Sequence, residues 1–188
     1  MNAPPNGLDV LLDRNRAAAA RGAHRGVPLM PRRRVFVVTC LDPRVEPAGF
    51  LGLEPGDAMV IRNAGGRVTP AVLADLAFIE ALAARQAPAG PLFEIAVVHH
   101  TDCGTGALAH EQFRTTFARR IGADERALAD EAVTEPASSV LVDVERVRTS
   151  AWLSSRVSVS GHVYDLDTGL VSTVAPAAAC SVPVGTAS

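Results

Sequence analysis

Two short stretches of the sequence carry side chains that could bind a metal ion. Cys40 ends one apolar run and is followed by Asp42 and Arg44, and His100 and Cys103 follow a second apolar run. Two thiolates and one imidazole are ligands that bind Zn²⁺ tetrahedrally. Three protein ligands leave the fourth position open, which is typical of catalytic zinc, whereas structural sites are closed by four ligands. The pattern therefore predicts a catalytic zinc site.

Each half of this pattern also has a simpler interpretation. A lone cysteine at a strand end usually packs in the core, and Asp42 and Arg44 alone could form a local salt bridge at a turn. His99 is favoured over His100 to face the core, although periodicity does not decide between them. Cys180 has no nearby histidine and is interpreted as a free thiol. The presence of both halves, each at the end of a strand, favours the metal site.

Alternating strand-like and helix-like segments predict an α/β fold. We expect a mostly parallel central sheet flanked by helices on both faces, with an N-terminal helical arm and a C-terminal β-hairpin. The expected strands are Val35–Cys40, Ala58–Arg62 and Leu92 to about His99, followed by a hairpin over 156–174. The expected helices are Leu8–Arg21, a short turn over 47–51, Pro70 to about Arg85 with Thr69 as its cap, a face marked by Phe113, Phe117 and Ile121 and closed by Gly122, Asp124–Val133, and Ala137–Arg148.

The whole chain, residues 1–188, is expected to form one domain, in which residues 1–34 are the arm. In parallel α/β sheets, sites form at the carboxyl ends of the strands. Cys40 ends the first strand, and His100 and Cys103 follow the third. If these strands are neighbours, the three ligands meet at the end of the sheet where the strands have their carboxyl ends.

Composition excludes several classes of protein. Hydrophobic residues make up 48% of the chain, which argues against disorder. No apolar run approaches the roughly 18 to 20 residues of a membrane span, and the net charge of −2 suggests no general affinity for nucleic acid. All 18 basic residues are arginine, which excludes Schiff-base lysine chemistry. Three cysteines and no evident signal peptide favour a cytoplasmic protein with metal-bound thiolates over a disulfide framework.

The combined motifs resemble the β-class carbonic anhydrases. The resemblance rests on Cys40-x-Asp42-x-Arg44 and His100-x-x-Cys103, with the sequence Arg-Asn-Ala-Gly at 62–65 between them, and spans about 29–120. The run 99–104 is similar to a bacterial branch of small enzymes that also includes carbonyl sulfide hydrolases. The resemblance implies Zn²⁺ held by the two cysteines and the histidine. It also implies two alternative states, with Asp42 either paired to Arg44 or bound to zinc as a fourth ligand.

The function that this resemblance implies is the reversible hydration of CO₂ to bicarbonate by zinc-bound hydroxide. Asp42 would accept the proton of the hydroxide, and Arg44 would hold Asp42 in place. The backbone N–H of Gly104 would receive the developing carboxylate oxygen.

Two alternatives remain open. One is hydrolysis of COS or CS₂ at the same zinc, because Pro31 stands where the plant-type pattern has a glutamine associated with substrate binding. The other is a non-catalytic zinc-binding or thiol-redox module, against which Asp42 and Arg44 argue because neither role needs them.

The partner implied for the protein is a second copy of itself. The arm before Met30 has too little apolar surface to fold alone, and the first hairpin strand, around Val157–Val163, would leave a sheet edge that needs covering. A twofold dimer is the commonest way to bury both. We therefore expect a homodimer or a dimer of dimers.

Overall fold

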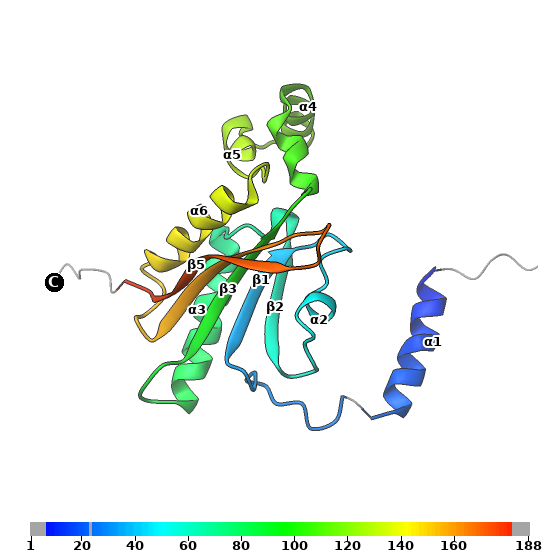
Figure 1. Ribbon diagram of the computed structural model, residues 1–188, viewed down its shortest axis with the longest axis vertical. Helices are drawn as coiled ribbons and strands as arrows, with labels where there is room; N and C mark the ends of the chain where they lie inside the picture. The colour runs from blue at the N-terminus through cyan, green and yellow to red at the C-terminus, as the bar shows by residue number, and fades with distance from the viewer. Residues whose placement is uncertain (1–6, 23, 182–188) are drawn as a thin grey trace, which may run out of the picture.

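A five-stranded sheet forms the centre of the molecule (Figure 1). The computed structural model describes residues 7–22 and 24–181. The strands stand in the order β2-β1-β3-β4-β5, and all neighbours are parallel except β4 and β5. The strands are β1 Val35–Cys40, β2 Ala58–Asn63, β3 Phe93–His100, β4 Val157–Tyr164 and β5 Val171–Ala179. The predicted mostly parallel sheet with a C-terminal hairpin is therefore confirmed.

Helices and two short 3-10 turns connect the strands. They are α1 Gly7–Ala20, α2 Pro47–Phe50, η1 Ala64–Gly66, α3 Pro70–Gln86, η2 Gly104–Ala109, α4 Glu111–Ile121, α5 Glu125–Asp130 and α6 Pro136–Arg148. The N-terminal helix is confirmed as α1. The helix expected over Asp124–Val133 is shorter, since α5 ends at Asp130, and the sequence patterns predict neither 3-10 turn.

Local sequence signals explain where several helices begin and end. The hydroxyl of Thr69 accepts a hydrogen bond from the backbone N–H of Val72, and Pro70 occupies the first turn of α3. Asp124 caps α5 in the same way. Gly122 ends α4 in the left-handed conformation with φ 67°, which glycine adopts without steric cost.

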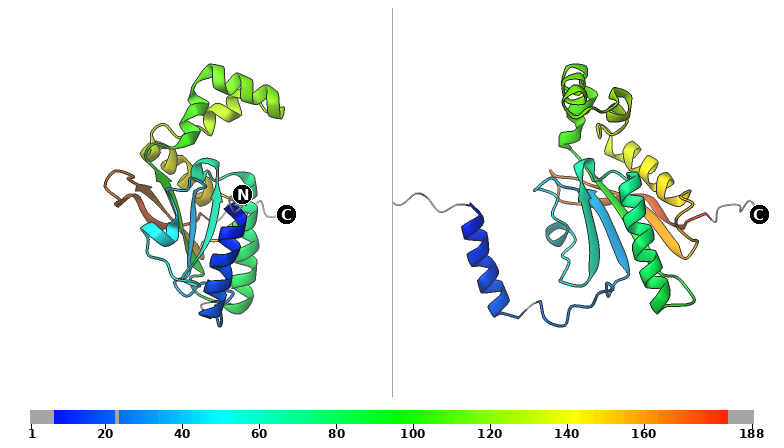
Figure 2. Two further views of the ribbon diagram at one scale, coloured as in Figure 1. Left: turned by 90° about the vertical axis from the view of Figure 1, so that its right-hand side faces the viewer. Right: turned by 180° about the vertical axis from the view of Figure 1, so that it is seen from behind.

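Most of the core lies between the sheet and two long helices on one face. Phe36 and Val38 of β1 belong to one buried cluster with Leu76 of α3 and Val140 of α6. Within residues 7–22 and 24–181, the opposite face carries only the one-turn α2, as Figures 1 and 2 show. A hollow of about 360 Å³ remains on that face, lined mainly by apolar side chains of the sheet and of the segment after α2: Val35, Val37, Leu51, Leu53, Ala96 and Val98. Both faces are covered as predicted, but very unequally.

The chain path explains this asymmetry. The connection from β1 to β2 runs in one direction along the sheet, whereas the connections from β2 to β3 and from β3 to β4 run in the other. Parallel crossovers are almost always right-handed, so a reversal of direction places the connecting helices on opposite faces. The strand order reverses at β1 and β3, which makes the carboxyl ends of these two strands the expected place for a binding crevice.

The expectation about the sheet edge is wrong. The first hairpin strand, β4, is paired on both sides, with β3 and with β5, so the edges of the sheet are β2 and β5. The reason is that the hairpin turns outward and places its second strand at the edge.

The arm helix α1 has no buried residues and stands apart from the sheet (Figures 1 and 2). No helix in the described part of the chain is long and apolar enough to cross a membrane.

Candidate metal centre

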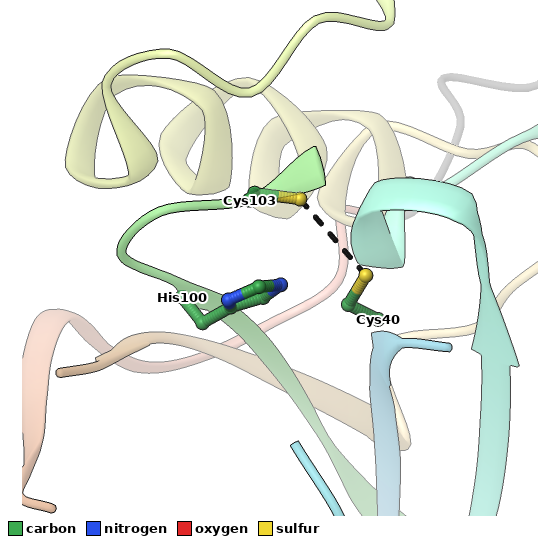
Figure 3. A group of neighbouring side chains, drawn as sticks. All are labelled: Cys40, His100 and Cys103. Carbon is green, nitrogen blue, oxygen red and sulfur yellow. Dashed lines mark hydrogen bonds between the residues drawn. The ribbon is translucent and has the colours of Figure 1, made fainter. Parts of the chain in front are cut away.

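The pairing of β1 with β3 brings the predicted ligands together. Thr39 is aligned with Val98 across the two strands, and its hydroxyl donates a hydrogen bond of 2.8 Å to the Val98 carbonyl. Cys40 therefore ends β1 beside the last residues of β3, where His100 lies. The turn that follows β3 brings Cys103 back toward both of them, and the three side chains face one another in Figure 3.

The spacing of the three side chains fits a tetrahedral metal ion. One ligand atom from each of Cys40, His100 and Cys103 lies within 4.8 Å of the others, and the two sulfur atoms are 3.9 Å apart. Two sulfurs bound at about 2.3 Å to a tetrahedral zinc would be about 3.8 Å apart. The predicted ligands are therefore placed together at a distance that suits zinc.

The orientation of His100 gives independent support for a metal. Its Nδ1 lies 2.8 Å from the Thr101 carbonyl, which can only accept, so Nδ1 carries the proton. The Nε2 atom is then an acceptor, and it is buried without a hydrogen-bond partner. Buried acceptors without a partner are rare, and a histidine fixed through its other nitrogen is typical of metal ligands.

The two thiols interact strongly with each other. Their mutual hydrogen bond, more than any other contact, lowers the pKa of Cys103 to about 6 and raises that of Cys40 to about 12. The contact therefore favours the thiolate form of Cys103 over that of Cys40. Thr105 adds to the effect, because its hydroxyl oxygen lies 3.2 Å from the Cys103 sulfur and can donate to a thiolate.

Asp42 and Arg44 form a tight pair beside the ligands. Arg44 donates to one oxygen of Asp42 from its backbone N (2.9 Å) and Nε (3.0 Å), and to the other oxygen from Nη2 (2.7 Å). These hydrogen bonds hold the pKa of Asp42 at about 2, so the carboxylate is ionised at neutral pH. Among the described residues, the group able to hold a metal comprises only Cys40, His100 and Cys103. The structure therefore has Asp42 paired with Arg44.

Two residues that support this pair are given no role by the sequence reasoning. Asp102 accepts hydrogen bonds from Arg44 through its side chain (2.7 Å) and its backbone carbonyl (2.9 Å), and its φ of 53° lies in the left-handed region. Arg62 donates to the backbone carbonyls of Cys40 (3.0 Å) and Asp42 (2.8 Å). The position of Arg62 near the end of β2 is a signal that could have found it. The side-chain role of Asp102 has no sequence signal beyond its place in the turn.

Gly104 and Pro31 occupy very different places. Gly104 opens η2 directly after Cys103 and is exposed, and a Cβ atom built there would meet nothing within 4 Å. The Cβ position of Gly104 is therefore not crowded by other segments of the chain. Pro31 instead lines a hollow with Ala83 and Leu92, next to the beginning of β3, and thus lies at the opposite end of the sheet from the metal site within this chain.

A three-donor metal site at the reversal point of an open α/β sheet defines a candidate catalytic metal centre. Residues 35–171 match the protein family described as "Carbonic anhydrase". The chain therefore belongs to the β-class carbonic anhydrase family, and the resemblance seen in the sequence motifs is confirmed.

Individual relatives support the same assignment. The chain is 28% identical over 162 residues to "Beta-carbonic anhydrase 1" of Mycobacterium tuberculosis, covering 86% of this chain and 94% of that protein. It is 29% identical over 167 residues to "Carbon disulfide hydrolase" of Acidianus sp., covering 77% and 78%. The solved structure of a carbonic anhydrase from Streptococcus mutans superposes with a TM-score of 0.76 at 34% identity, covering 92% of this chain and 99% of the other.

Replacement of either cysteine of the cluster should remove the metal. We expect Cys40→Ser and Cys103→Ser each to lose most of the zinc, because a serine hydroxyl is a far poorer zinc ligand than a thiolate. The measurement is zinc content per chain by elemental analysis after purification. Cys180→Ser is the matched control, since Cys180 is a buried free cysteine outside the cluster. Full zinc occupancy in both cluster variants would contradict the assignment.

Gly66 should be needed for the shape of the site. A Cβ atom on Gly66 would lie 2.8 Å from the Thr39 carbonyl carbon and 2.9 Å from the Cys40 nitrogen, and neither backbone atom can move without displacing Cys40. Gly66→Ala should lower the free energy of unfolding by about 2 kcal/mol or more and reduce zinc content. Gly169 has a similar φ of 70° with open space around it, so Gly169→Ala carries only the conformational cost. Equal losses in both variants, measured by denaturant unfolding, would show that the contact with Cys40 is unimportant.

Proposed function

We propose that this protein is a zinc-dependent enzyme that catalyses the reversible hydration of CO₂ to bicarbonate. The observation that carries the proposal is the ionised Asp42, fixed by Arg44 next to three converging metal ligands. Membership of the carbonic anhydrase family supports it. A zinc-storage or thiol-redox module would need no fixed carboxylate at this place, so an enzyme is the better interpretation.

Cys40, His100 and Cys103 would hold the zinc ion through two sulfurs and Nε2. A bound zinc ion supplies a water molecule whose pKa is lowered toward neutrality, and hence a nucleophile. The overall reaction adds one water molecule to CO₂ and yields bicarbonate and one proton, which would pass to solvent.

The residues around the metal ligands would orient the reactants. An ionised carboxylate only accepts hydrogen bonds, so Asp42 would take the hydrogen bond of the attacking water and turn an oxygen lone pair toward CO₂. Arg44 prevents rotation of Asp42 because it holds both carboxylate oxygens. The backbone N–H of Gly104 would stabilise the negative charge that develops on the carboxylate oxygen. The alternative state, in which Asp42 itself binds the metal, would require Asp42 to leave Arg44.

A second candidate function is hydrolysis of CS₂ or COS at the same metal. It is favoured by the identity with the Acidianus protein named for carbon disulfide hydrolysis. Pro31 lies far from the ligands within the chain, so the missing glutamine gives this candidate no support from the chain's own structure. Hydration of CO₂ therefore remains the leading proposal.

A stopped-flow assay tests the function. We expect the zinc-loaded protein to hydrate CO₂, and Asp42→Asn to retain zinc but lose about 100-fold or more in kcat, because an amide also donates hydrogen bonds and cannot fix the orientation of the water. Asp75→Asn, on the exposed surface of α3, is the matched control.

The same preparation is then assayed with COS and CS₂. A higher kcat/KM with either sulfur compound than with CO₂ would favour the second candidate. Zinc-loaded protein that turns over none of the three would overturn both candidates, and near wild-type turnover of Asp42→Asn would show that the pair with Arg44 is only structural.

We also propose that the chain works in the cytoplasm as one domain, residues 1–188, in a homodimer or a dimer of dimers. The arm helix α1 buries nothing in its own chain, and Leu11 and Leu12 are exposed. The thinly covered sheet face leaves an apolar hollow. A second copy that covers these surfaces would remove apolar area from water, which favours association.

Removal of the arm should weaken this assembly. We expect deletion of residues 1–28 to shift the protein toward the monomer in sedimentation at micromolar concentration and to reduce activity, because the interface would help to shape the pocket. The double variant Leu11→Ser with Leu12→Ser should weaken the assembly in the same way. Arg14→Ser, which exchanges one polar side chain of α1 for another, is its control. An active full-length monomer at the same concentration would contradict the proposed assembly.

A further inference from the structure

A buried carboxylate lies behind the metal ligands, on the helix-covered side of the sheet. Asp143 of α6 is fully buried. Arg67 donates to it from Nε at 2.7 Å, and Arg146 donates to it at 2.8 Å. Burial alone would raise the pKa of Asp143, but contacts with His99 and Arg67 outweigh it and lower the pKa. The group is therefore an ionised carboxylate in the interior.

Stability alone is a weak explanation for such a group. A buried ion pair often contributes no more stability than apolar side chains of the same volume, because both charges must leave water. Where such pairs persist, one attested role is to select a particular arrangement of the chain. The carboxylate of Asp143 connects three segments of the chain that surround the metal ligands.

The first segment is the glycine loop next to the two cysteines. Arg67 follows Gly65 and Gly66 directly, and Arg67 is 2% exposed. A Cβ atom on Gly66 would clash with the backbone at Cys40, and one on Gly65 would lie 3.0 Å from the hydroxyl of Thr105. The same hydroxyl contacts the Cys103 sulfur. By fixing Arg67, Asp143 fixes a loop that packs against both cysteine-bearing segments.

The second segment is the end of β3. His99 is fully buried, and its Nε2 lies 3.1 Å from Asp143, although not at the angles of a regular hydrogen bond. On the other side of the ring, Nδ1 lies 2.8 Å from the hydroxyl of Ser139. His99 directly precedes His100, so the position of the His99 ring constrains the backbone that carries the third metal ligand.

The third segment joins α5 to α6. Arg67 donates a hydrogen bond of 2.9 Å to the backbone carbonyl of Asp130. Three residues further on, Val133 packs in one buried cluster with Cys40 and Cys103. The wall of the site opposite the sheet is therefore tied to Asp143 through the same arginine.

We propose that Asp143 is a positioning residue of the metal centre, which holds the glycine loop, the end of β3 and the α5–α6 connection in the arrangement that brings Cys40, His100 and Cys103 together. It touches neither metal nor substrate and acts through Arg67 and His99. The inference rests on the proposed zinc site, and it adds a residue that no motif of that site contains.

The test uses the full-length protein loaded with zinc, and separately with Co²⁺, whose visible absorption bands report ligand geometry. Asp143→Asn keeps the shape of the side chain but removes its charge. We expect zinc loss to a chelator to become about 10- to 100-fold faster and the Co²⁺ bands to shift. Val147→Ala is the control, because Val147 is equally buried on the same helix; it should destabilise the fold but leave both readouts unchanged.

Asp143→Asn that behaves like Val147→Ala in both readouts overturns the inference and leaves the proposed function intact. Wild-type protein that binds neither metal overturns the proposed function, and this inference with it. If Asp143→Asn does not fold, Ser139→Ala decides, because it removes only the hydroxyl beside His99: faster zinc loss supports the positioning role, and an unchanged rate overturns it.

Discussion

The parallel pairing of β1 with β3 is the constraint on which the rest of the structure depends. The two strands are neighbours although they are separated in the sequence by β2 and α3. Their alignment, with Thr39 opposite Val98, places Cys40 and His100 at the same end of the sheet, where these strands have their carboxyl ends. Because the chain path reverses direction at these strands, no crossing helix covers their carboxyl ends. The metal ligands therefore lie at the carboxyl ends of two neighbouring strands for a topological reason.

Side-chain contacts of Arg44 then hold together the loops that carry the ligands. Arg44 bonds to Asp42 in the segment after β1 and to Asp102 in the turn after β3, and so it ties the two ligand-bearing loops together. Asp102 adopts a left-handed conformation that costs a non-glycine residue about 1 to 2 kcal/mol. The bonds from Arg44 to its side chain and its carbonyl offset that cost. Besides fixing Asp42, Arg44 therefore links the loop after β1 to the turn after β3.

Much of this arrangement can be predicted from the sequence. The apolar run from Val35 to Cys40, the cap at Thr69 and the stop at Gly122 are local signals, and the structure places these elements where the signals predict. The ligand types and their position at strand ends predict which side chains meet at the site. These features are predictable because each depends on a few neighbouring residues.

Other features depend on contacts between distant residues and have no local signal. Asp143 is one of several charged residues in the amphipathic helix α6, and nothing in the sequence singles it out. Only the fold shows that Arg67 and His99 converge on it. The edge position of β5 depends on which way the hairpin turns, which alternation of apolar residues does not encode. The unequal cover of the two sheet faces follows from the brevity of α2 combined with the strand order. Pro31 lies far from the metal ligands within the chain, because a sequence position relative to a motif does not by itself place a residue beside that motif.

The buried carboxylate of Asp143 also bears on which of the two adjacent histidines at the end of β3 faces the metal site. His99 and His100 are chemically identical and differ only in the side of the sheet that they face. A slip of β3 by one residue would turn every side chain of the strand to the other face, so each histidine would face the side that the other now faces. In the slipped strand His100 would be the residue facing α6, and His99 would be offered to the metal from a displaced backbone. In the observed register Nε2 of His99 lies 3.1 Å from Asp143 and its Nδ1 lies 2.8 Å from the Ser139 hydroxyl. These contacts hold His99 on the helix-covered side of the sheet and thereby leave His100 to face Cys40 and Cys103 before any metal binds.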